Sequence, residues 1–372
     1  MSEARPYYIG LISGTSADGI DAALVSFAPQ PMLHTALIHP YDDDLRRRIL
    51  ALAQGDGCIA LDELGRLDVE IARAFANAAE ALLTKAGVDR DRVAAIGSHG
   101  QTVRHRPQGV APYTMQLGDP NVIAEITRIT TAADFRRRDL AAGGQGAPLA
   151  PAFHAAMIAR GEAARVVLNL GGIANITIVP REGGGPVRGF DTGPASCLLD
   201  AWMQHERGRA FDEGGKFAAS GRVDRRLLER LLAEPYFAAA PPKSTGREVF
   251  HLTWLAQKLA GMRVESADVQ ATLVALTARS IADAVHMHAP DTREVLVCGG
   301  GVHNPVLMAA IGQALAPADV ASVARLGIDP DFVEAMTFAW LARERLAGRP
   351  LADVPDVTGA RGPRALGGVY FG

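Results

Sequence analysis

The sequence predicts an α/β fold made of two related halves. Strand-like apolar runs alternate with helical patterns along the whole chain, which favours mixed α/β architecture. At 372 residues the chain is longer than a single hydrophobic core usually serves, so we expect two domains. A glycine-rich turn between two apolar runs near the N-terminus is echoed roughly 155 residues later, which indicates one α/β unit present twice.

The individual elements follow from hydrophobic periodicity and from the residues that bound each run. The predicted strands are Tyr7–Ile12, Ile20–Phe27, Val93–Ser98, Arg165–Leu170, Ile176–Val179 and Val295–Cys298. The predicted helices are Leu61–Gly87, Leu140–Ala159, Ser196–Glu206, Val223–Leu232, Val269–His286, Pro305–Leu315 and Pro330–Ala347. Asp329 before Pro330 suits an N-cap followed by the first helical residue. Residues 181–188 and 241–247 are predicted loops, and a long loop in a compact domain is commonly functional.

Composition narrows the class of protein. A net charge of −3 gives no reason to expect nucleic-acid binding. The basic cluster Arg136–Arg138 is bracketed by Asp134 and Asp139, which argues against a free polybasic tail. Three widely spaced cysteines fit a reducing compartment and offer no zinc site. The chain shows neither a signal-peptide pattern nor an apolar run of the ~18 residues that span a bilayer. We therefore expect a cytoplasmic protein with no membrane or nucleic-acid partner.

The turn between the first two predicted strands contains mostly small, hydroxyl and carboxyl side chains. Gly10, Gly14 and Gly19 allow unusual dihedrals and close approach of the backbone. Successive N–H groups and hydroxyls of such a turn can face an anion. Asp18 and Asp21 offer carboxylates to Mg²⁺, the ion that accompanies phosphates. Taken alone, the same residues also suit an ordinary hairpin.

Two further turns follow strands later in the chain. Gly171 and Gly172 lie between apolar runs, and Gly299–Gly301 connect a strand to a helix, which brings a helix N-terminus near a ligand. The sequence has no GxxxxGK[ST], GxGxxG, HExxH or GxSxG motif. Three glycine turns on strands in two halves are typical of phosphotransferases of the hexokinase–actin–Hsp70 type.

Eleven short motifs extend this pattern over essentially the whole chain. In order they are SGTSADGID (13–21), GSHGQT (97–102), QLGDP (116–120), DFRRRD (134–139), GGQGAPL (143–149), NLGGIAN (169–175), FDTGP (190–194), PPKSTGRE (241–248), DVQATL (268–273), CGGG (298–301) and EAM (334–336). Each is weak alone. Together they make the chain resemble the anhydro-N-acetylmuramic acid kinases.

The resemblance implies an ATP-dependent transferase with an alcohol group as acceptor. Such a kinase opens 1,6-anhydro-N-acetylmuramic acid with water and phosphorylates O6, giving N-acetylmuramic acid 6-phosphate for peptidoglycan recycling. It also implies Mg²⁺, a homodimer and a two-domain actin-like ATPase fold, a duplicated ribonuclease H-like unit with its active site in the interdomain cleft. We expect residues 1–126 with 361–372 as domain I, and residues 127–360 as domain II.

The resemblance also assigns roles to individual residues. Asp191 is the expected catalytic base that takes a proton from the attacking water, although a turn aspartate before Gly-Pro would look the same. Arg136 offers bidentate geometry to the lactyl carboxylate of the sugar. Glu334 is expected to recognise sugar hydroxyls, although a helix N-terminus favours a carboxylate anyway. His99 and Gln101 are further candidates for the sugar pocket, and a satisfied buried histidine is the alternative.

The remaining assignments concern the nucleotide. The ATP phosphates and Mg²⁺ are assigned to the first turn, with Asp18 and Asp21 as metal ligands. The second turn is assigned as a second phosphate loop, and the third turn is assigned to the adenosine. These residues are Gly14, Thr15, Ser16, Ala17, Asp18, Gly19, Ile20, Asp21, Gly171, Gly172, Gly299, Gly300 and Gly301.

Three points stay open at this level. Ala195-Ser196 replace the Gly-Asn that the family more usually has after this proline, which puts the local contacts in doubt. Lys243 suits either a phosphate or the surface of a loop. Another sugar or acyl kinase of the superfamily, or a non-catalytic nucleotide-binding module, is the competing interpretation.

Overall fold

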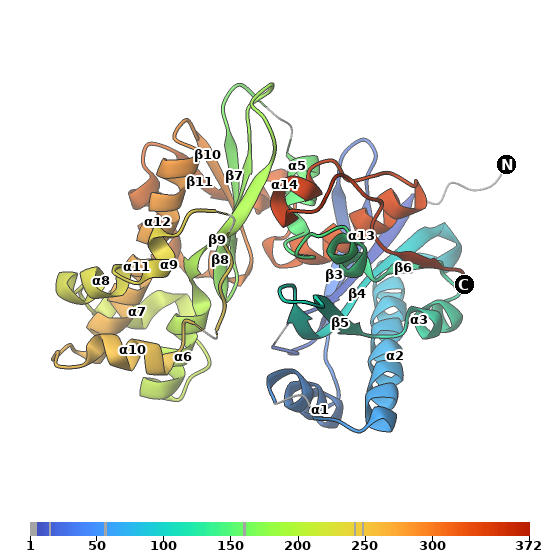
Figure 1. The fold of residues 1–372 in the computed structure, drawn as a ribbon, viewed down its shortest axis with the longest axis horizontal. Coiled ribbons are helices and arrows are strands. Elements are labelled where there is room, and N and C mark those ends of the chain that lie inside the picture. The colour runs from blue at the N-terminus through green and yellow to red at the C-terminus, as the bar shows by residue number, and fades with distance from the viewer. Residues whose placement is uncertain (1–5, 15, 56–57, 159–160, 242, 248) are drawn as a thin grey trace. The chain divides into compact units, whose positions relative to one another are not determined.

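The computed structural model describes residues 6–14, 16–55, 58–158, 161–241, 243–247 and 249–372 (Figure 1). By their contacts, the residues form two compact units. Unit 1 comprises residues 1–157 and 332–372, and unit 2 comprises residues 158–331. Each unit has its own sheet and its own hydrophobic core.

The sheet of unit 1 is built around two parallel central strands. β1 (Tyr7–Ser13) pairs in parallel with β4 (Val93–Arg106), and β4 pairs in parallel with β6 (Thr131–Ala133). On the other side, β2 (Ile20–Ser26) and β3 (Met32–His39) follow as antiparallel strands. Two short strands complete the sheet: β5 (Tyr113–Leu117) pairs with β4, and β12 (Gly368–Tyr370) pairs with β6.

The sheet of unit 2 repeats this arrangement. β7 (Arg165–Leu170) is followed by antiparallel β8 (Ile173–Val179) and β9 (Arg188–Pro194). On its other side, β10 (Glu294–Cys298) and β11 (Asp319–Ser322) are parallel. The order β9-β8-β7-β10-β11 therefore matches β3-β2-β1-β4-β6 in position and direction. The predicted duplication is confirmed: each unit contains the same arrangement of five strands, and the fold is a two-domain α/β fold.

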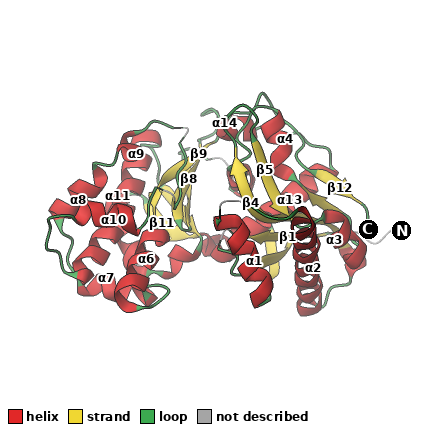
Figure 2. Ribbon diagram, turned by 60° about the horizontal axis from the view of Figure 1, so that its bottom comes forward, coloured by secondary structure: helices red, strands yellow, loops and turns green. Residues whose placement is uncertain are grey.

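Seven α-helices in the described part of unit 1 accompany its sheet (Figure 2). They are α1 (Asp43–Gln54), α2 (Leu61–Ala86), α3 (Pro120–Thr127), α4 (Phe135–Ala141), α5 (Ala150–Met157), α13 (Val333–Leu346) and α14 (Val354–Thr358). Ile9 and Leu11 of β1 share a core cluster with α2, whereas a Cβ on Gly10 would collide with the backbone of α13. Because successive strand residues face opposite sides, α2 and α13 cover opposite faces of the sheet.

The described part of unit 2 contains seven α-helices. They are α6 (Ser196–Arg207), α7 (Lys216–Ser220), α8 (Arg225–Leu232), α9 (Pro235–Ala238), α10 (Leu252–Leu259), α11 (Ser266–His288) and α12 (Pro305–Leu315). α11 is buried along most of its length, from Val269 to Val285. It packs against α6, α7, α8 and α12 and against β9, so it is the central helix of this unit (Figure 1).

Most sequence-based elements are confirmed, and two helices need correction. All six predicted strands are present, and the helices predicted from residues 61, 196, 223, 269 and 305 correspond to α2, α6, α8, α11 and α12. The predicted helix 140–159 is wrong: α4 ends at Ala141 and α5 begins at Ala150, because the glycine-rich stretch between them turns the chain, with φ of +86° at Gly143 and +72° at Gly146. Its last predicted residue, Ala159, lies outside the described residues.

The last long helix begins later than predicted. Residues 330–332 form a short 3-10 turn, and α13 itself starts at Val333. Asp329 accepts a hydrogen bond from the Asp331 amide (3.1 Å), so it caps this turn rather than the helix.

Unit 1 is larger than the expected domain I. The helices α4, α5 and α13 belong to it by contact, since α13 packs on β1, β2, β4 and β6 and α5 packs on α13. The expected limits at residues 126 and 361, and an active site in the cleft between the domains, stay predictions. None of the helices that the structure describes is long and apolar enough to cross a membrane.

Candidate functional site

The first glycine turn connects β1 to β2 in unit 1. Its tightest point is Ala17, which is fully buried and has a φ of +49°, and the Ala17 amide donates to the Gly14 carbonyl (3.1 Å). Gly10, Gly14 and Gly19 do not have positive φ, so the conformational freedom that glycine allows is not used there through φ. Close approach does explain Gly19, where a Cβ would lie 2.7 Å from Ile38 Cγ2. Thr15 lies outside the described residues.

Side chains from two neighbouring elements bind the carbonyl oxygens of this turn. Gln101 of β4 is fully buried, and its Nε2 donates to the Gly14 carbonyl (3.1 Å). Arg46 of α1 donates through Nε to the Ala17 carbonyl (3.0 Å) and through Nη2 to the Ser16 carbonyl (3.3 Å). Gln101, a sequence-based candidate for the sugar pocket, is thus placed against the turn itself.

The two carboxylates assigned to Mg²⁺ differ in their surroundings. Asp18 Oδ1 lies 2.7 Å from Nη2 of Arg46; the Asp18 side chain is exposed and that of Arg46 is partly buried. Asp21 is half-buried; it is the second residue of β2 and lies opposite Ile12 of β1. Within the described residues, no group of three or more His, Cys, Asp or Glu side chains is arranged to hold a metal ion. Any Mg²⁺ here would therefore depend on phosphate oxygens and water for most of its ligands.

Three of the candidate sugar-binding residues come together in unit 1. Arg136 of α4 donates through Nε to His99 Nε2 (2.9 Å) and through Nη1 to the Gly146 carbonyl (2.7 Å). Glu334, in the first turn of α13, is close enough to Arg136 for a favourable charge interaction. The guanidinium is therefore fixed in orientation by two acceptors, which is what bidentate recognition of a carboxylate requires.

The electrostatics of this cluster keep His99 neutral. Burial, with a further contribution from the Arg136 charge, lowers the pKa of His99 well below its usual value. A neutral ring can accept at Nε2 only when its proton is on Nδ1, so the contact with Arg136 selects that tautomer. Burial also lowers the pKa of Arg136, to about 10, and Glu334 and Asp139 counteract this shift. Arg136 therefore stays protonated at neutral pH.

The other charges of the DFRRRD motif have structural roles. Asp139 is buried and accepts hydrogen bonds from the Gly146 amide (2.7 Å) and from the Thr358 hydroxyl (2.8 Å). It thereby holds the glycine-rich loop whose Gly146 carbonyl faces Arg136. Arg137 forms an ion pair with Asp134 (3.5 Å).

Asp191 lies within β9 of unit 2, a strand that the sequence analysis did not predict. Its Oδ2 accepts from the Ser244 hydroxyl (2.9 Å) and from the Thr245 amide (3.0 Å). Its backbone also bonds to the same loop through the Lys243 carbonyl (3.2 Å), and its carbonyl accepts from the Tyr236 hydroxyl (2.7 Å). The predicted loop 241–247 is thus the segment that orients the carboxylate. Pro242 lies outside the described residues.

Lys243 and Arg247 of this loop differ in role. Lys243 Nζ donates to the Tyr236 and Phe237 carbonyls (3.2 Å each) and lies over the Tyr236 ring, so it anchors the loop. Arg247 is exposed, and its guanidinium lies beside Gly172, 3.7 Å from the place of a Cβ there. Sequence reasoning missed Arg247 although the PPKSTGRE motif contains it, because only the fold brings it to the second glycine turn.

The second glycine turn, between β7 and β8, is bound by the start of α6. The amides of Ala195 and Cys197 donate to the Gly172 carbonyl (3.0 Å each), and the Ser196 amide donates to the Gly171 carbonyl (3.1 Å). The unusual Ala195-Ser196 pair is therefore used through its backbone. The Ser196 hydroxyl bonds to Asp200, whose pKa burial raises to about 6 despite Ser196 and the nearby Arg247 charge.

The third glycine turn packs against the second. Gly299 has a φ of +83°, and a Cβ there would lie 2.5 Å from Asn169 Oδ1. A Cβ on Gly301 would lie 2.5 Å from the Cβ of Leu170, the last residue of β7. Only glycine permits this approach, so two of the three predicted turns meet at one edge of the unit 2 sheet.

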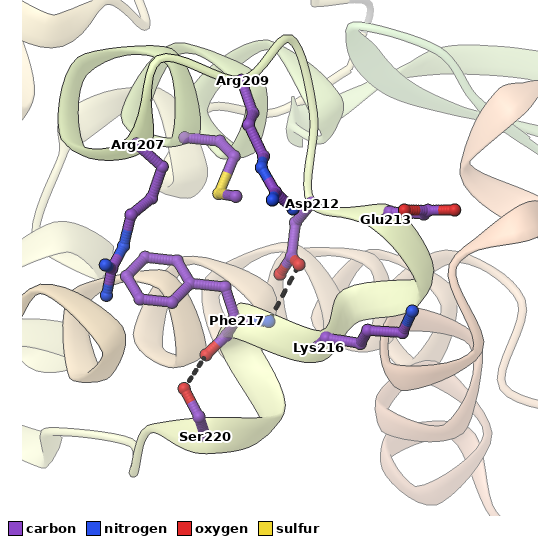
Figure 3. Close-up of a pocket in the computed structure, with 8 residues that line it drawn as sticks. Arg207, Arg209, Asp212, Glu213, Lys216, Phe217 and Ser220 are labelled. Atoms are coloured by element: carbon purple, nitrogen blue, oxygen red, sulfur yellow. Dashed lines mark hydrogen bonds between the residues drawn. The ribbon is translucent and has the colours of Figure 1, made fainter.

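The cavities described below, one in each unit, are lined mostly by residues other than the predicted site residues. A cavity of about 450 Å³ in unit 2 is lined by Arg207, Arg209, Lys216 and Phe217 among others, and by none of the predicted site residues (Figure 3). Asp212 in its wall is already satisfied by the Phe217 and Ala218 amides (2.8 and 2.9 Å). A cavity of about 210 Å³ in unit 1 includes His99, Gln116 and Asp119. Asp119 caps α3 by accepting from the Asn121 amide (2.9 Å).

Comparison with known proteins adds to this geometry. The family model described as anhydro-N-acetylmuramic acid kinase matches residues 6–372. The chain is 58% identical over 369 residues to the anhydro-N-acetylmuramic acid kinase of Xanthomonas axonopodis pv. citri, covering 98% of each chain. It is 53% identical to that of Xylella fastidiosa, covering 98% of this chain and 96% of the relative.

Among solved structures, the activator of 2-hydroxyisocaproyl-CoA dehydratase from Clostridium difficile, with bound ADPNP, is similar at a TM-score of 0.46. The two chains are 11% identical, and the match covers 92% of this chain and 96% of the activator. The family model and the curated relatives both span nearly the whole sequence, and the residues singled out above lie within that span. The chain belongs to the anhydro-N-acetylmuramic acid kinase family.

Proposed function

We propose that this protein is an ATP-dependent kinase that opens 1,6-anhydro-N-acetylmuramic acid and phosphorylates O6. The products are N-acetylmuramic acid 6-phosphate and ADP, and the role is in peptidoglycan recycling. Membership of the family carries this proposal. The residues in hand supply a group for each part of the reaction: a carboxylate for the water, a fixed guanidinium for the sugar acid, and glycine turns for the phosphates.

Asp191 is the proposed base. In the reaction, water attacks the anomeric carbon, the bridging C1–O6 bond breaks, and O6 attacks the terminal phosphoryl group of ATP. The carboxylate takes the proton of the water, a contribution on the order of 10²–10⁴-fold. The two hydrogen bonds from Ser244 and Thr245 to Oδ2 fix the side chain in one orientation, which supports this role.

Arg136 is the proposed partner of the lactyl carboxylate of the sugar. Its contacts with His99 and Gly146 hold the guanidinium plane, and Glu334 nearby offers an acceptor for hydroxyl groups. His99 therefore acts through Arg136, as a positioning residue.

ATP is the proposed phosphate donor, with Mg²⁺ bound to its phosphates. The first and second glycine turns would donate amides to phosphate oxygens, the third would contact adenosine, and Arg247 beside Gly172 would supply a cation. Mg²⁺ would neutralise phosphate charge. Asp18 and Asp21 are the proposed carboxylate ligands, and the Asp18 carboxylate also pairs with Arg46. A cytoplasmic homodimer completes the proposal.

The test is ADP release measured with anhydro-sugar, with plain N-acetylmuramic acid and with no sugar. We expect turnover with the anhydro-sugar alone. Asp191→Asn should bind ATP normally and lose nearly all turnover, whereas Asp283→Asn, an exposed carboxylate paired with Arg279, should behave as wild type. Turnover with plain N-acetylmuramic acid would indicate another sugar kinase, and sugar-independent ATP hydrolysis would indicate a different ATPase; near-normal activity of Asp191→Asn would refute the assignment of the base.

A further inference from the structure

The carbonyl oxygens of the first and second glycine turns accept hydrogen bonds, but the donors are different groups in the two units. In unit 2 the donors are backbone amides at the start of α6, which bind the Gly171 and Gly172 carbonyls. In unit 1 the donors are side chains: Gln101 binds the Gly14 carbonyl, and Arg46 binds the Ser16 and Ala17 carbonyls. Only the first turn therefore depends on two individual side chains for its shape.

This arrangement determines where the amides of the turn point. In a trans peptide, the carbonyl of one residue and the N–H of the next point in opposite directions. Because the Ala17 carbonyl faces Arg46, the Asp18 amide faces away from Arg46. Binding the Ala17 carbonyl from behind thus leaves the Asp18 amide on the opposite side of the turn, where an anion can accept from it.

Both side chains are themselves held in place. Gln101 Oε1 accepts from the hydroxyl of Tyr41 (3.4 Å), a buried residue just before α1. Arg46 also pairs with Asp18 across 2.7 Å, so its charge is balanced within the turn. The turn also contains Ala17 at a φ of +49°, a conformation that an unsupported alanine seldom adopts. Gln101 and Arg46 therefore hold a strained turn in one conformation.

We propose that Arg46 and Gln101 are positioning residues that preorganise the first glycine turn for the phosphates of the nucleotide, with Asp18 as the counter-ion of Arg46. The proposal rests on the proposed use of ATP. It predicts that losing either side chain weakens binding of phosphate-bearing nucleotides, because the turn must then be ordered at the expense of binding free energy. Binding of adenosine, which lacks phosphates, should be unaffected.

The test is calorimetric binding of ATP and of adenosine, without sugar, to the full-length protein. Arg46→Ala and Gln101→Leu should weaken ATP binding roughly 10- to 100-fold, since each removes at least one bond made by the turn. Adenosine binding should change less than about twofold. Arg46→Lys, which can still donate to one carbonyl, should recover part of the loss. Arg47→Ala is the matched control, because Arg47 is the next residue on the same helix, is exposed and pairs with Asp44.

The alternative is that the two side chains only stabilise the fold. In that case Arg46→Ala and Gln101→Glu, the second of which preserves volume, would lower the melting temperature and leave ATP affinity within about twofold of wild type. That result would overturn the proposal. Failure of the proposed function would look different, because wild-type protein would then bind ATP without turning over the anhydro-sugar.

Discussion

The packing of α13 on β1 makes a sharp prediction for Gly10→Ala. A Cβ on Gly10 would lie 1.8 Å from the carbonyl oxygen of Ala335 and 2.8 Å from the amide nitrogen of Ala339. Real Cβ contacts essentially never fall below 3.0 Å, so α13 must retreat by at least 1.2 Å, the difference between 3.0 and 1.8 Å. Both obstacles are backbone atoms, and no rotamer change relieves them.

The cost should appear in stability and in sugar binding together. Overpacking a well-packed core costs about 1–3 kcal/mol and occasionally more, and an obstacle made of helix backbone places Gly10→Ala at or above 3 kcal/mol. Glu334 precedes Ala335 in the first turn of α13, so the same retreat moves its carboxylate. A misplacement of about 1 Å in a substrate-positioning group can cost on the order of 100-fold in catalytic efficiency.

Urea unfolding and steady-state kinetics with the anhydro-sugar measure the two effects. Gly65→Ala in α2 is the matched control, because a Cβ there meets nothing within 4 Å. The same substitution should stabilise that helix by up to about 1 kcal/mol and leave the kinetics unchanged. If Gly10→Ala unfolds at the same urea concentration as wild type, the close approach of α13 to β1 is wrong.

Three more outcomes follow from the site. Arg247→Ala should weaken ATP binding, measured by calorimetry, about tenfold and change adenosine binding little, because Arg247 places a cation beside the second glycine turn. If the variant and the wild type bind ATP with equal affinity, Arg247 is not part of the site. Below pH 6.5 the unfolded chain protonates His99 whereas the folded protein keeps it neutral, so the free energy of unfolding should fall with decreasing pH by up to about 1.4 kcal/mol per pH unit. His99→Gln should remove that part of the slope in urea titrations, and an unchanged slope would show that His99 titrates normally. Asp18→Asn and Asp21→Asn should each raise the Mg²⁺ concentration for half-maximal activity, and a variant with the wild-type Mg²⁺ dependence would remove that carboxylate from the metal site.

Local pattern was sufficient for the alternation of strands and helices and for the doubled turn. Strand β7 and helix α12 were predicted to the residue, because apolar periodicity and the N-cap Asn304 with Pro305 act over a few neighbouring residues. The predicted helix 140–159 was wrong because its prediction relied on the local apolar pattern alone. That pattern suits a helix, but Gly143 and Gly146 adopt left-handed conformations there and interrupt it. Strand β9 was not among the predicted strands, because residues 181–188 were predicted as a loop; its pairing with β8 is formed by Arg188–Pro194.

What the sequence by itself determined was the family, through the order of its motifs, and with it the choice of Asp191, Arg136 and Glu334 as the proposed groups for the reaction. What only the tertiary structure decided was which groups touch. Gln101 donates to the Gly14 carbonyl, Asp18 pairs with Arg46, and Arg247 lies beside Gly172. The roles of Gln101 toward the sugar and of Asp18 toward a metal stay predictions. The physical reason is that a residue's type sets which bonds it can form, whereas its partners in those bonds come from strands and helices that are distant along the chain.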